Sequence, residues 1–276
     1  MNILVIGGAG FIGSHLCEKL KDGNEVISLD NYFTGRKENH VKGVKYIELD
    51  SKEIDLIPPP DIVFHLGEYS RVLTCYEDME QLIESNYIGT MRVLEYCRKN
   101  KVRLVYAGSS TKFGDTESPY SYFKAQNTEL IKKYGEWFGL DYAITYFYNV
   151  YGGREIKEGK YATVIGIFEQ NRKHKIPHTI NGKGNQTRNF THIDDIVNGI
   201  ITVGLKGKGE YCLGNEKDYT IYEVAKMFGG EIIFCESKKG DRISSKIDLD
   251  RIEKLGWEAK IDLKDYICEL PTSSTK

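Results

Sequence analysis

The sequence predicts an α/β protein built on a doubly wound parallel sheet, followed by a smaller C-terminal lobe. In the first half of the 276 residues, short continuous apolar runs alternate with amphipathic stretches, as expected of strands that helices cover on both faces. After about residue 150 the alternation weakens, and glycine and polar residues that we expect to form loops gather at 152–160 and 181–189. We therefore place one domain at 1–150 and a mainly substrate-binding lobe at 151–276, with residues 190–205 returning to the first domain.

Strands and helices are predicted in alternating order. Six apolar runs are predicted strands, at residues 3–6, 25–29, 45–49, 61–66, 102–107 and 141–147. Amphipathic helices are predicted at residues 11–20, 76–99, 120–138 and 194–203. Three consecutive prolines at 58–60 form the turn before the fourth strand. Helical crossovers of this length let neighbouring strands pair in parallel.

Composition excludes several classes of function. The chain is 40% hydrophobic and 28% charged, with a formal net charge of −2, so it has no basic excess for nucleic acid or an anionic membrane surface. Six cysteines are scattered singly without metal-ligand spacing. No apolar run approaches the ~20 residues of a membrane span, and the N-terminus lacks the cationic start of a signal peptide. We expect a cytoplasmic protein with reduced thiols and no metal.

A glycine-rich turn joins the first predicted strand to the first helix. Gly7 permits the tight turn, Gly10 lets the backbone approach a pyrophosphate, and Gly13 lets helix and strand pack closely. The helix N-terminus then offers unpaired N–H groups to phosphate. A purely structural turn is the alternative, but Asp30 ends the next strand, where its carboxylate would bind a ribose 2′-hydroxyl. The pattern predicts a Rossmann-type NAD site and argues against NADP, whose 2′-phosphate the carboxylate would repel.

Tyr120 and Lys124 are one helical turn apart on a predicted helix. Tyr222 and Lys226 have the same spacing, which is also expected by chance in a chain this rich in both residues. Context separates the two pairs, because Tyr120 follows a strand whose carboxyl end delivers Ser109. Such strand ends are where ligands bind in open α/β sheets. A tyrosine can act as a base when cations favour its phenolate, and a serine hydroxyl can hydrogen-bond the reacting oxygen, so the trio fits hydride removal from a carbinol.

These motifs together resemble the extended short-chain dehydrogenase/reductase family, and most closely its NAD-dependent, UDP-glucose 4-epimerase-like branch. The resemblance covers nearly the whole chain. It implies that Ser109, Tyr120 and Lys124 are catalytic. It also implies a set of NAD contacts, namely Gly7, Gly10, Phe11, Ile12, Gly13, Asp30, Asn31, Thr34, Gly35, Asp50, Ser51, Leu66, Gly67, Asn86, Tyr120, Lys124, Phe147 and Val150. The nucleotide-sugar contacts it implies are Thr111, Asn149, Arg188, Lys238, Asp241 and Ser245, with Arg188 on the diphosphate.

Some positions depart from the family pattern. Lys238 stands where the family has arginine, and Asn189 replaces the aspartate after Arg188. The segment between Gly114 and Tyr120 is shorter than in relatives, so part of the wall over the sugar is expected to be missing. Family dehydratases carry acidic residues directly after the catalytic serine or threonine, whereas this chain has Ser110 and Thr111.

The resemblance therefore favours C4 epimerisation of a nucleotide-diphosphate sugar through a transient 4-keto intermediate. UDP-glucose, UDP-galactose or their N-acetyl forms are the expected substrates, because the small side chain of Ser245 would leave room for an acetamido group. A 4-ketosugar reductase or dehydratase is one alternative, and a non-catalytic NAD-sensing protein is another. We also expect a homodimer formed by the helices at 76–99 and 120–138, whose large apolar residues include Leu82, Tyr87, Val93, Leu94, Ile131 and Trp137. The same residues could instead pack on the sheet.

Overall fold

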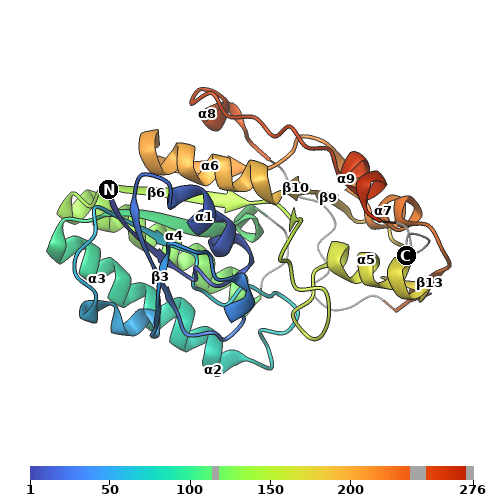
Figure 1. The fold of residues 1–276 in the computed structure, drawn as a ribbon, viewed down its shortest axis with the longest axis horizontal. Helices are drawn as coiled ribbons and strands as arrows, with labels where there is room; N and C mark the ends of the chain where they lie inside the picture. The colour runs from blue at the N-terminus through green and yellow to red at the C-terminus, as the bar shows by residue number, and fades with distance from the viewer. Residues whose placement is uncertain (114–117, 237–246, 272–276) are drawn as a thin grey trace.

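The computed structural model describes residues 1–113, 118–236 and 247–271, and it confirms the predicted α/β class (Figure 1). Its centre is a seven-stranded sheet of order β11-β6-β5-β4-β1-β2-β3, in which every neighbouring pair is parallel. The strands are β1 (Asn2–Ile6), β2 (Glu25–Asp30), β3 (Lys45–Glu48), β4 (Ile62–His65), β5 (Arg103–Ser109), β6 (Tyr142–Phe147) and β11 (Gly209–Leu213). From β1 the chain first builds the sheet to one side, with β2 and β3, and then to the other side, beginning with β4. The strand order therefore reverses between β1 and β4, and ligands bind at the carboxyl ends of strands at such a topological switch point.

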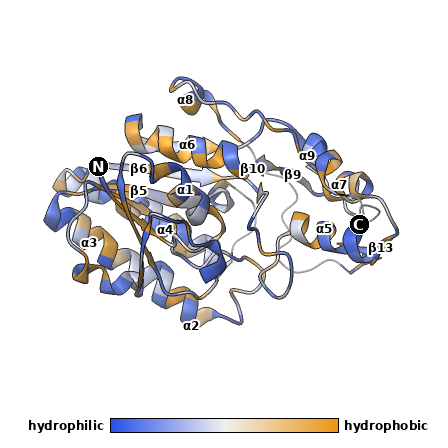
Figure 2. Ribbon diagram, viewed as in Figure 1, coloured by the Kyte–Doolittle hydropathy of each residue, from blue (hydrophilic) through white to orange (hydrophobic). Residues whose placement is uncertain are grey.

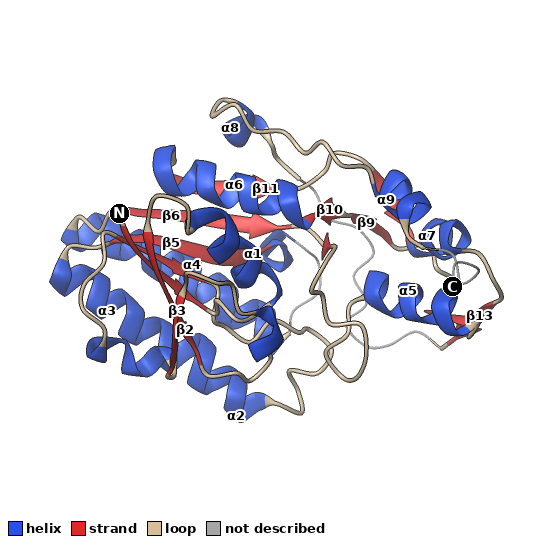
Figure 3. Ribbon diagram, in the orientation of Figure 1, coloured by secondary structure: helices blue, strands red, loops and turns tan. Residues whose placement is uncertain are grey.

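Helices cover both faces of this sheet (Figure 3). On one face, α1 (Phe11–Leu20) and α6 (Ile193–Lys206) bury apolar side chains against β1, β4 and β5. On the other face, α3 (Thr90–Asn100) and α4 (Pro119–Phe138) do the same. Figure 2 shows the hydrophobic stripes on these amphipathic helices, as the predicted helical periodicity requires. The arrangement is the doubly wound layering that the sequence predicts.

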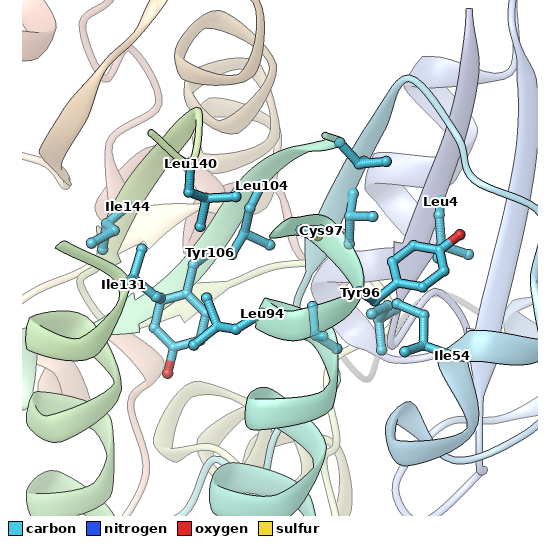
Figure 4. Close-up of a cluster of buried hydrophobic side chains, with 14 of the residues drawn as sticks. Leu4, Ile54, Leu94, Tyr96, Cys97, Leu104, Tyr106, Ile131, Leu140 and Ile144 are labelled. Carbon is cyan, nitrogen blue, oxygen red and sulfur yellow. The ribbon is translucent and has the colours of Figure 1, made fainter. Parts of the chain in front are cut away.

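An apolar core lies between the sheet and the helices α3 and α4. Leu104 and Ile144 from the sheet meet Leu94 of α3 and Ile131 of α4, and all four are completely buried. The ring of Tyr106 lies among them, with its hydroxyl at the edge of the cluster (Figure 4). A buried phenol needs a polar partner, because leaving its O–H unsatisfied costs about 1–3 kcal/mol. Tyr106 therefore connects the apolar core to a polar network beside the site.

The helix predicted at 76–99 is built differently from the expectation. It begins three residues later as α2 (Met79–Leu82), continues as the π-helical segment η3 (Ile83–Gly89), and ends as α3 at Asn100. Gly89, at the end of η3, packs closely against the 3₁₀ helix η2 (Ser51–Leu56): a Cβ at Gly89 would lie 2.2 Å from Ser51 Oγ. Such π segments occur often at functional sites.

The chain returns to the main sheet through α6 and then β11, which pairs with β6 as an edge strand. The sequence did not indicate β11, and Gly209–Leu213 therefore belongs with the sheet rather than with the lobe where the predicted boundaries placed it. The short helix α8 (Asp250–Glu253) and the side chain of Trp257 pack on the same face of the sheet as α6.

The lobe has its own apolar core, formed by α5 (Val164–His174), α7 (Ile221–Phe228) and α9 (Leu263–Glu269). Short strand pairs frame it: β10 (Thr191–His192) with β7 (Val150–Tyr151), β12 (Asp218–Thr220) with β9 (Thr187–Asn189), and β13 (Ile232–Cys235) with β8 (His178–Asn181). The expected loop at 181–189 is thus only partly a loop, because pairing with β12 makes its last three residues a strand. In the described part of the chain, no helix combines the length and apolarity needed to cross a membrane.

Candidate active site

The turn between β1 and α1 has the close packing that the glycine pattern predicts. Gly7 has a φ of 83°, in the left-handed region, and a Cβ there would lie 2.8 Å from the backbone of Gly67. A Cβ on Gly13 would lie 2.0 Å from the carbonyl oxygen of Gly7, a contact that no side chain tolerates. Among the described residues, no side chain caps the N-terminus of α1, so its N–H groups are available to a phosphate.

Asp30 lies at the carboxyl end of β2, on the wall of the same cavity. Its carboxylate accepts hydrogen bonds from the backbone N–H groups of Ala9 (2.9 Å) and Tyr32 (2.8 Å). Burial raises the pKa of Asp30, and these two hydrogen bonds oppose the rise. A Cβ on Gly35 would lie 2.5 Å from the carboxylate, so the glycine there leaves the acid room. The glycine-rich turn between β1 and α1 fits the pyrophosphate of NAD, and the Asp30 carboxylate fits its ribose.

A cavity of about 450 Å³ runs along the carboxyl ends of the strands. It brings together most of the predicted residues, namely Gly7, Gly10, Phe11, Ile12, Gly13, Asp30, Asn31, Thr34, Gly35, Ser51, Leu66, Gly67, Ser109, Thr111, Tyr120, Lys124, Phe147, Asn149 and Val150. These residues all belong to the first domain. Tyr161, Thr163 and Phe190 of the lobe line the same cavity, so it lies where the two meet.

Three predicted contacts are not on the cavity wall. Asp50 instead caps η2, where it accepts hydrogen bonds from Lys52 N and Asn31 Nδ2. Asn86 is fully buried and holds the backbone of Tyr69 through its side-chain oxygen (2.7 Å) and nitrogen (3.0 Å). Arg188 lies on β9, where its guanidinium donates to the carbonyl oxygen of Thr187. Three other predicted contacts, Lys238, Asp241 and Ser245, lie outside the described residues.

Ser109 ends β5, and its hydroxyl oxygen faces Thr111 as well as the cavity. The backbone N–H of Thr111 donates to Ser109 Oγ over 3.3 Å, and Thr111 Oγ1 lies 2.9 Å from the same atom. Because Ser109 Oγ accepts from this side, its own hydrogen is left to donate into the cavity. A hydroxyl directed in this way can stabilise an oxygen that becomes a carbonyl.

Tyr120 and Lys124 come from the first two turns of α4. Ser118 caps this helix by accepting from the N–H of Ser121, and Pro119 occupies the first turn, both common signals of a helix start. Tyr120 is 7% exposed and Lys124 is 5% exposed. Lys124 Nζ donates to the carbonyl oxygen of Ala107 (2.6 Å) and pairs with Glu68. The fold therefore holds both side chains in fixed positions on the cavity wall.

Two charged cavity residues were missed by the sequence analysis. Glu68 and Arg71 lie three and six residues after the end of β4, in the segment that begins with the predicted Leu66 and Gly67. The available signal was the rule that ligands bind at the carboxyl ends of strands, applied beyond Gly67. The Arg71 guanidinium donates to the carbonyl oxygens of Tyr161 and Ser70, and no carboxylate within the described residues forms an ion pair with it. Burial lowers the pKa of Arg71, although a guanidinium keeps its proton in proteins.

Comparison with known proteins gives one consistent result. Residues 3–214 match the model of the NAD-dependent epimerase/dehydratase family. A candidate UDP-glucose 4-epimerase from Methanocaldococcus jannaschii is 33% identical over 96% of this chain and 95% of its own. UDP-glucuronic acid decarboxylase 3 from Arabidopsis thaliana is 30% identical over 96% of this chain and 86% of its own.

Solved structures agree with these relatives. UDP-glucose 4-epimerase from Thermotoga maritima, determined with UDP-glucose, superposes with a TM-score of 0.91 at 27% identity, covering 97% of this chain and 96% of that one. The Thermus thermophilus UDP-glucose 4-epimerase complex with NAD gives a TM-score of 0.89 at 27% identity over the same shares. A dTDP-glucose 4,6-dehydratase from Streptomyces venezuelae, with NAD bound, gives 0.88 at 25% identity over 96% of this chain and 94% of that one. Several reactions on nucleotide sugars are thus represented on this fold.

Proposed function

This chain belongs to the NAD-dependent epimerase/dehydratase family, and we propose that within it the protein interconverts C4 epimers of a nucleotide-diphosphate sugar. NAD is the cofactor. The observation that carries the proposal is the shared cavity, which joins the glycine turn and Asp30 to Ser109, Tyr120 and Lys124. The positions after Ser109 are Ser110 and Thr111, so neither offers the carboxyl group that would favour dehydration.

The residues divide the work of the reaction as follows. NAD, when bound, supplies a hydride acceptor that later returns the hydride. Tyr120 takes the proton of the 4-hydroxyl as C4 becomes a ketone, and Ser109 donates a hydrogen bond to the same oxygen. Lys124 has donors committed to Ala107 and Glu68, which leaves one N–H for the NAD ribose or the phenol. The keto sugar then turns over so that its opposite face would receive the hydride, and Tyr120 returns the proton to the oxygen at C4.

A tyrosine variant tests this assignment. Tyr120→Phe removes the proton acceptor and keeps the ring, so we expect kcat to fall by at least 100-fold with NAD binding retained. Turnover is measured with UDP-glucose, UDP-galactose and their N-acetyl forms, and NAD binding by calorimetry. Tyr222→Phe is the matched control, because Tyr222 has the same spacing from a lysine but does not line the cavity. Normal turnover in Tyr120→Phe would exclude the assignment.

Arg71 favours a second candidate, the decarboxylation of a nucleotide-linked uronic acid. A cavity guanidinium without a carboxylate partner in the described residues suits a substrate that brings its own carboxylate, and the decarboxylase relatives act on UDP-glucuronic acid by name. Oxidation at C4 places a ketone β to this carboxylate. The C5–C6 bond then breaks with release of CO₂, its electron pair goes to C5, and C5 takes a proton. Return of the hydride that NAD would have accepted from C4 would then reduce the ketone and give the UDP-pentose.

UDP-glucuronic acid distinguishes the two candidates. Release of CO₂ and formation of a UDP-pentose would establish decarboxylation, whereas a C4 epimer that keeps its carboxylate would leave epimerisation as the reaction. In either case Arg71→Met should raise KM for the uronic acid at least tenfold and change KM for UDP-glucose less. Equal effects on both sugars would remove Arg71 as a carboxylate ligand.

We also propose a homodimer that pairs the faces formed by η3, α3 and α4 in two copies. Of the predicted interface residues, Leu82, Val93, Leu94 and Ile131 are buried within the chain, whereas Tyr87 (49% exposed) and Trp137 (60%) remain on the surface. Tyr122 on α4 is also exposed, at 48%. Light scattering should give the mass of two chains for the wild type and of one for a Tyr87→Glu, Tyr122→Glu variant. A monomeric wild type would contradict the proposal.

A further inference from the structure

Glu68 is a carboxylate buried beside the predicted catalytic lysine, with 2% of its side chain exposed. It pairs with Lys124 Nζ and accepts hydrogen bonds from Thr90 Oγ1 and Asn127 Nδ2, the latter at 3.0 Å. The hydroxyl of Tyr106 donates to both carboxylate oxygens, at 3.0 and 2.8 Å. Four donors from three elements, namely β5, α3 and α4, therefore converge on one acid that lines the cavity.

The neighbours of Glu68 show that Lys124 is its one cationic partner among the described residues. Thr90 donates to Glu68, so its oxygen must accept from His65 Nε2, which lies 3.0 Å away. His65 Nδ1 has no partner in the described structure, as expected if the proton is on Nε2. Burial lowers the pKa of His65 to about 4, so the imidazole is neutral at pH 7. Tyr106 and Asn127 are neutral donors, and only Lys124 balances the negative charge.

We infer that Glu68 is a positioning residue for the reaction, which fixes the Lys124 ammonium and offsets its charge next to Tyr120. The inference rests on the proposed role of Tyr120 as proton acceptor. Lys124 is anchored on two sides, by Ala107 and by Glu68, so its remaining N–H has a set direction. The Tyr120 phenolate is less favoured than it would be beside an unpaired lysine, because the negative charge of Glu68 cancels part of the attraction between the Lys124 ammonium and the phenolate.

A structural role alone would give a different result. A buried ion pair is weak evidence for stability, because desolvating both charges offsets most of the attraction between them. If Glu68 only filled space, an isosteric amide would leave the ionisation of Tyr120 unchanged. If it sets the local charge, Glu68→Gln leaves the Lys124 cation unopposed, and the Tyr120 phenolate should form at lower pH.

Tyrosinate absorbance measures this ionisation without any substrate. All proteins are loaded with NAD and titrated with pH at 295 nm. Subtracting the curve of Tyr120→Phe from that of the wild type isolates Tyr120. Subtracting the curve of the double variant Glu68→Gln, Tyr120→Phe from that of the single variant Glu68→Gln gives the matching curve without the carboxylate. We expect the midpoint in the Glu68→Gln background to lie about one pH unit lower. Tyr106→Phe is the control, since it removes a hydrogen bond to the same carboxylate without changing charge, and its midpoint should stay in place.

An unchanged or higher midpoint in Glu68→Gln would overturn the inference. If that variant does not fold, Glu68→Asp keeps the charge and shortens the anchor. It should retain the wild-type midpoint while kcat falls and KM for the sugar stays constant, and a displaced midpoint would count against the inference. The titration also separates the two proposals: a lower midpoint in a protein that turns over no nucleotide sugar would sustain the role of Glu68 and reject the epimerase.

Discussion

At the scale of single residues, the glycine turn between β1 and α1 is the part of the site that tolerates substitution least. A Cβ on Gly13 would meet the backbone oxygen of Gly7 at 2.0 Å, and backbone cannot move aside as a flexible side chain can. Gly13→Ala should therefore weaken NAD binding at least tenfold, about 1.4 kcal/mol, in a calorimetric titration. Gly153→Ala is the control, because the nearest atoms to its Cβ would be 3.8 Å away, and equal affinity in the two variants would contradict the account.

His65 makes the stability of the fold depend on pH. Its pKa is lowered to about 4 by burial, whereas an exposed histidine titrates near 6.5. Between these values the unfolded chain binds a proton that the folded chain does not, so stability falls as the pH drops from 7 to 5, by about 2 kcal/mol from this group. His65→Gln should abolish that part of the loss in urea unfolding, and exposed His174→Gln should not. The same pH dependence in all three proteins would refute the prediction.

Sequence patterns located most of the cavity residues but not the direction of every side chain. Ser109, Tyr120 and Lys124 were found because strand ends and helix spacing place them on one edge of the sheet. Asp50 and Asn86 lie near that edge, yet each turns its polar atoms to nearby backbone N–H or C=O groups instead. Glu68 was missed because its importance depends on donors from three other elements, which the fold alone brings together.

At the scale of elements, the contact between η3 and η2 is a close fit that a paired substitution can test. Gly89→Ala would place a Cβ 2.2 Å from Ser51 Oγ, and overpacking of this kind costs about 1–3 kcal/mol. Ser51→Ala removes the oxygen, so the double variant should recover most of the loss in urea unfolding. Additive losses in the double variant would show that the clash lies elsewhere.

The elements that the sequence predicted are those with strong local signals. Continuous apolar strands and the amphipathic helices α1 and α4 were located nearly to their ends, whereas the eleven-residue helix α5 in the lobe was missed. The π segment could not be predicted, because its backbone hydrogen bonds span only one residue more than those of an α-helix. The strands β8 to β13 are two to five residues long, and their partners lie far along the chain, so they depend on tertiary pairing.

At the scale of the whole molecule, the site lies where the first domain meets the lobe. The sheet supplies the glycine turn, Asp30 and Ser109, α4 supplies Tyr120 and Lys124, and the lobe adds Tyr161 and Phe190. This division suits a reaction in which the sheet holds the cofactor and the lobe holds the nucleotide sugar while its ring turns over.

Proton NMR in D₂O tests the central claim most directly. The NAD-loaded protein would be incubated in turn with UDP-glucose, UDP-galactose and their N-acetyl forms. The account predicts a mixture of C4 epimers, no net NADH, and protium retained at C4, because the hydride that leaves C4 is the one that returns. Deuterium at C4 or C5, loss of the C6 hydroxymethyl signals, or no change in any of the four sugars would contradict it.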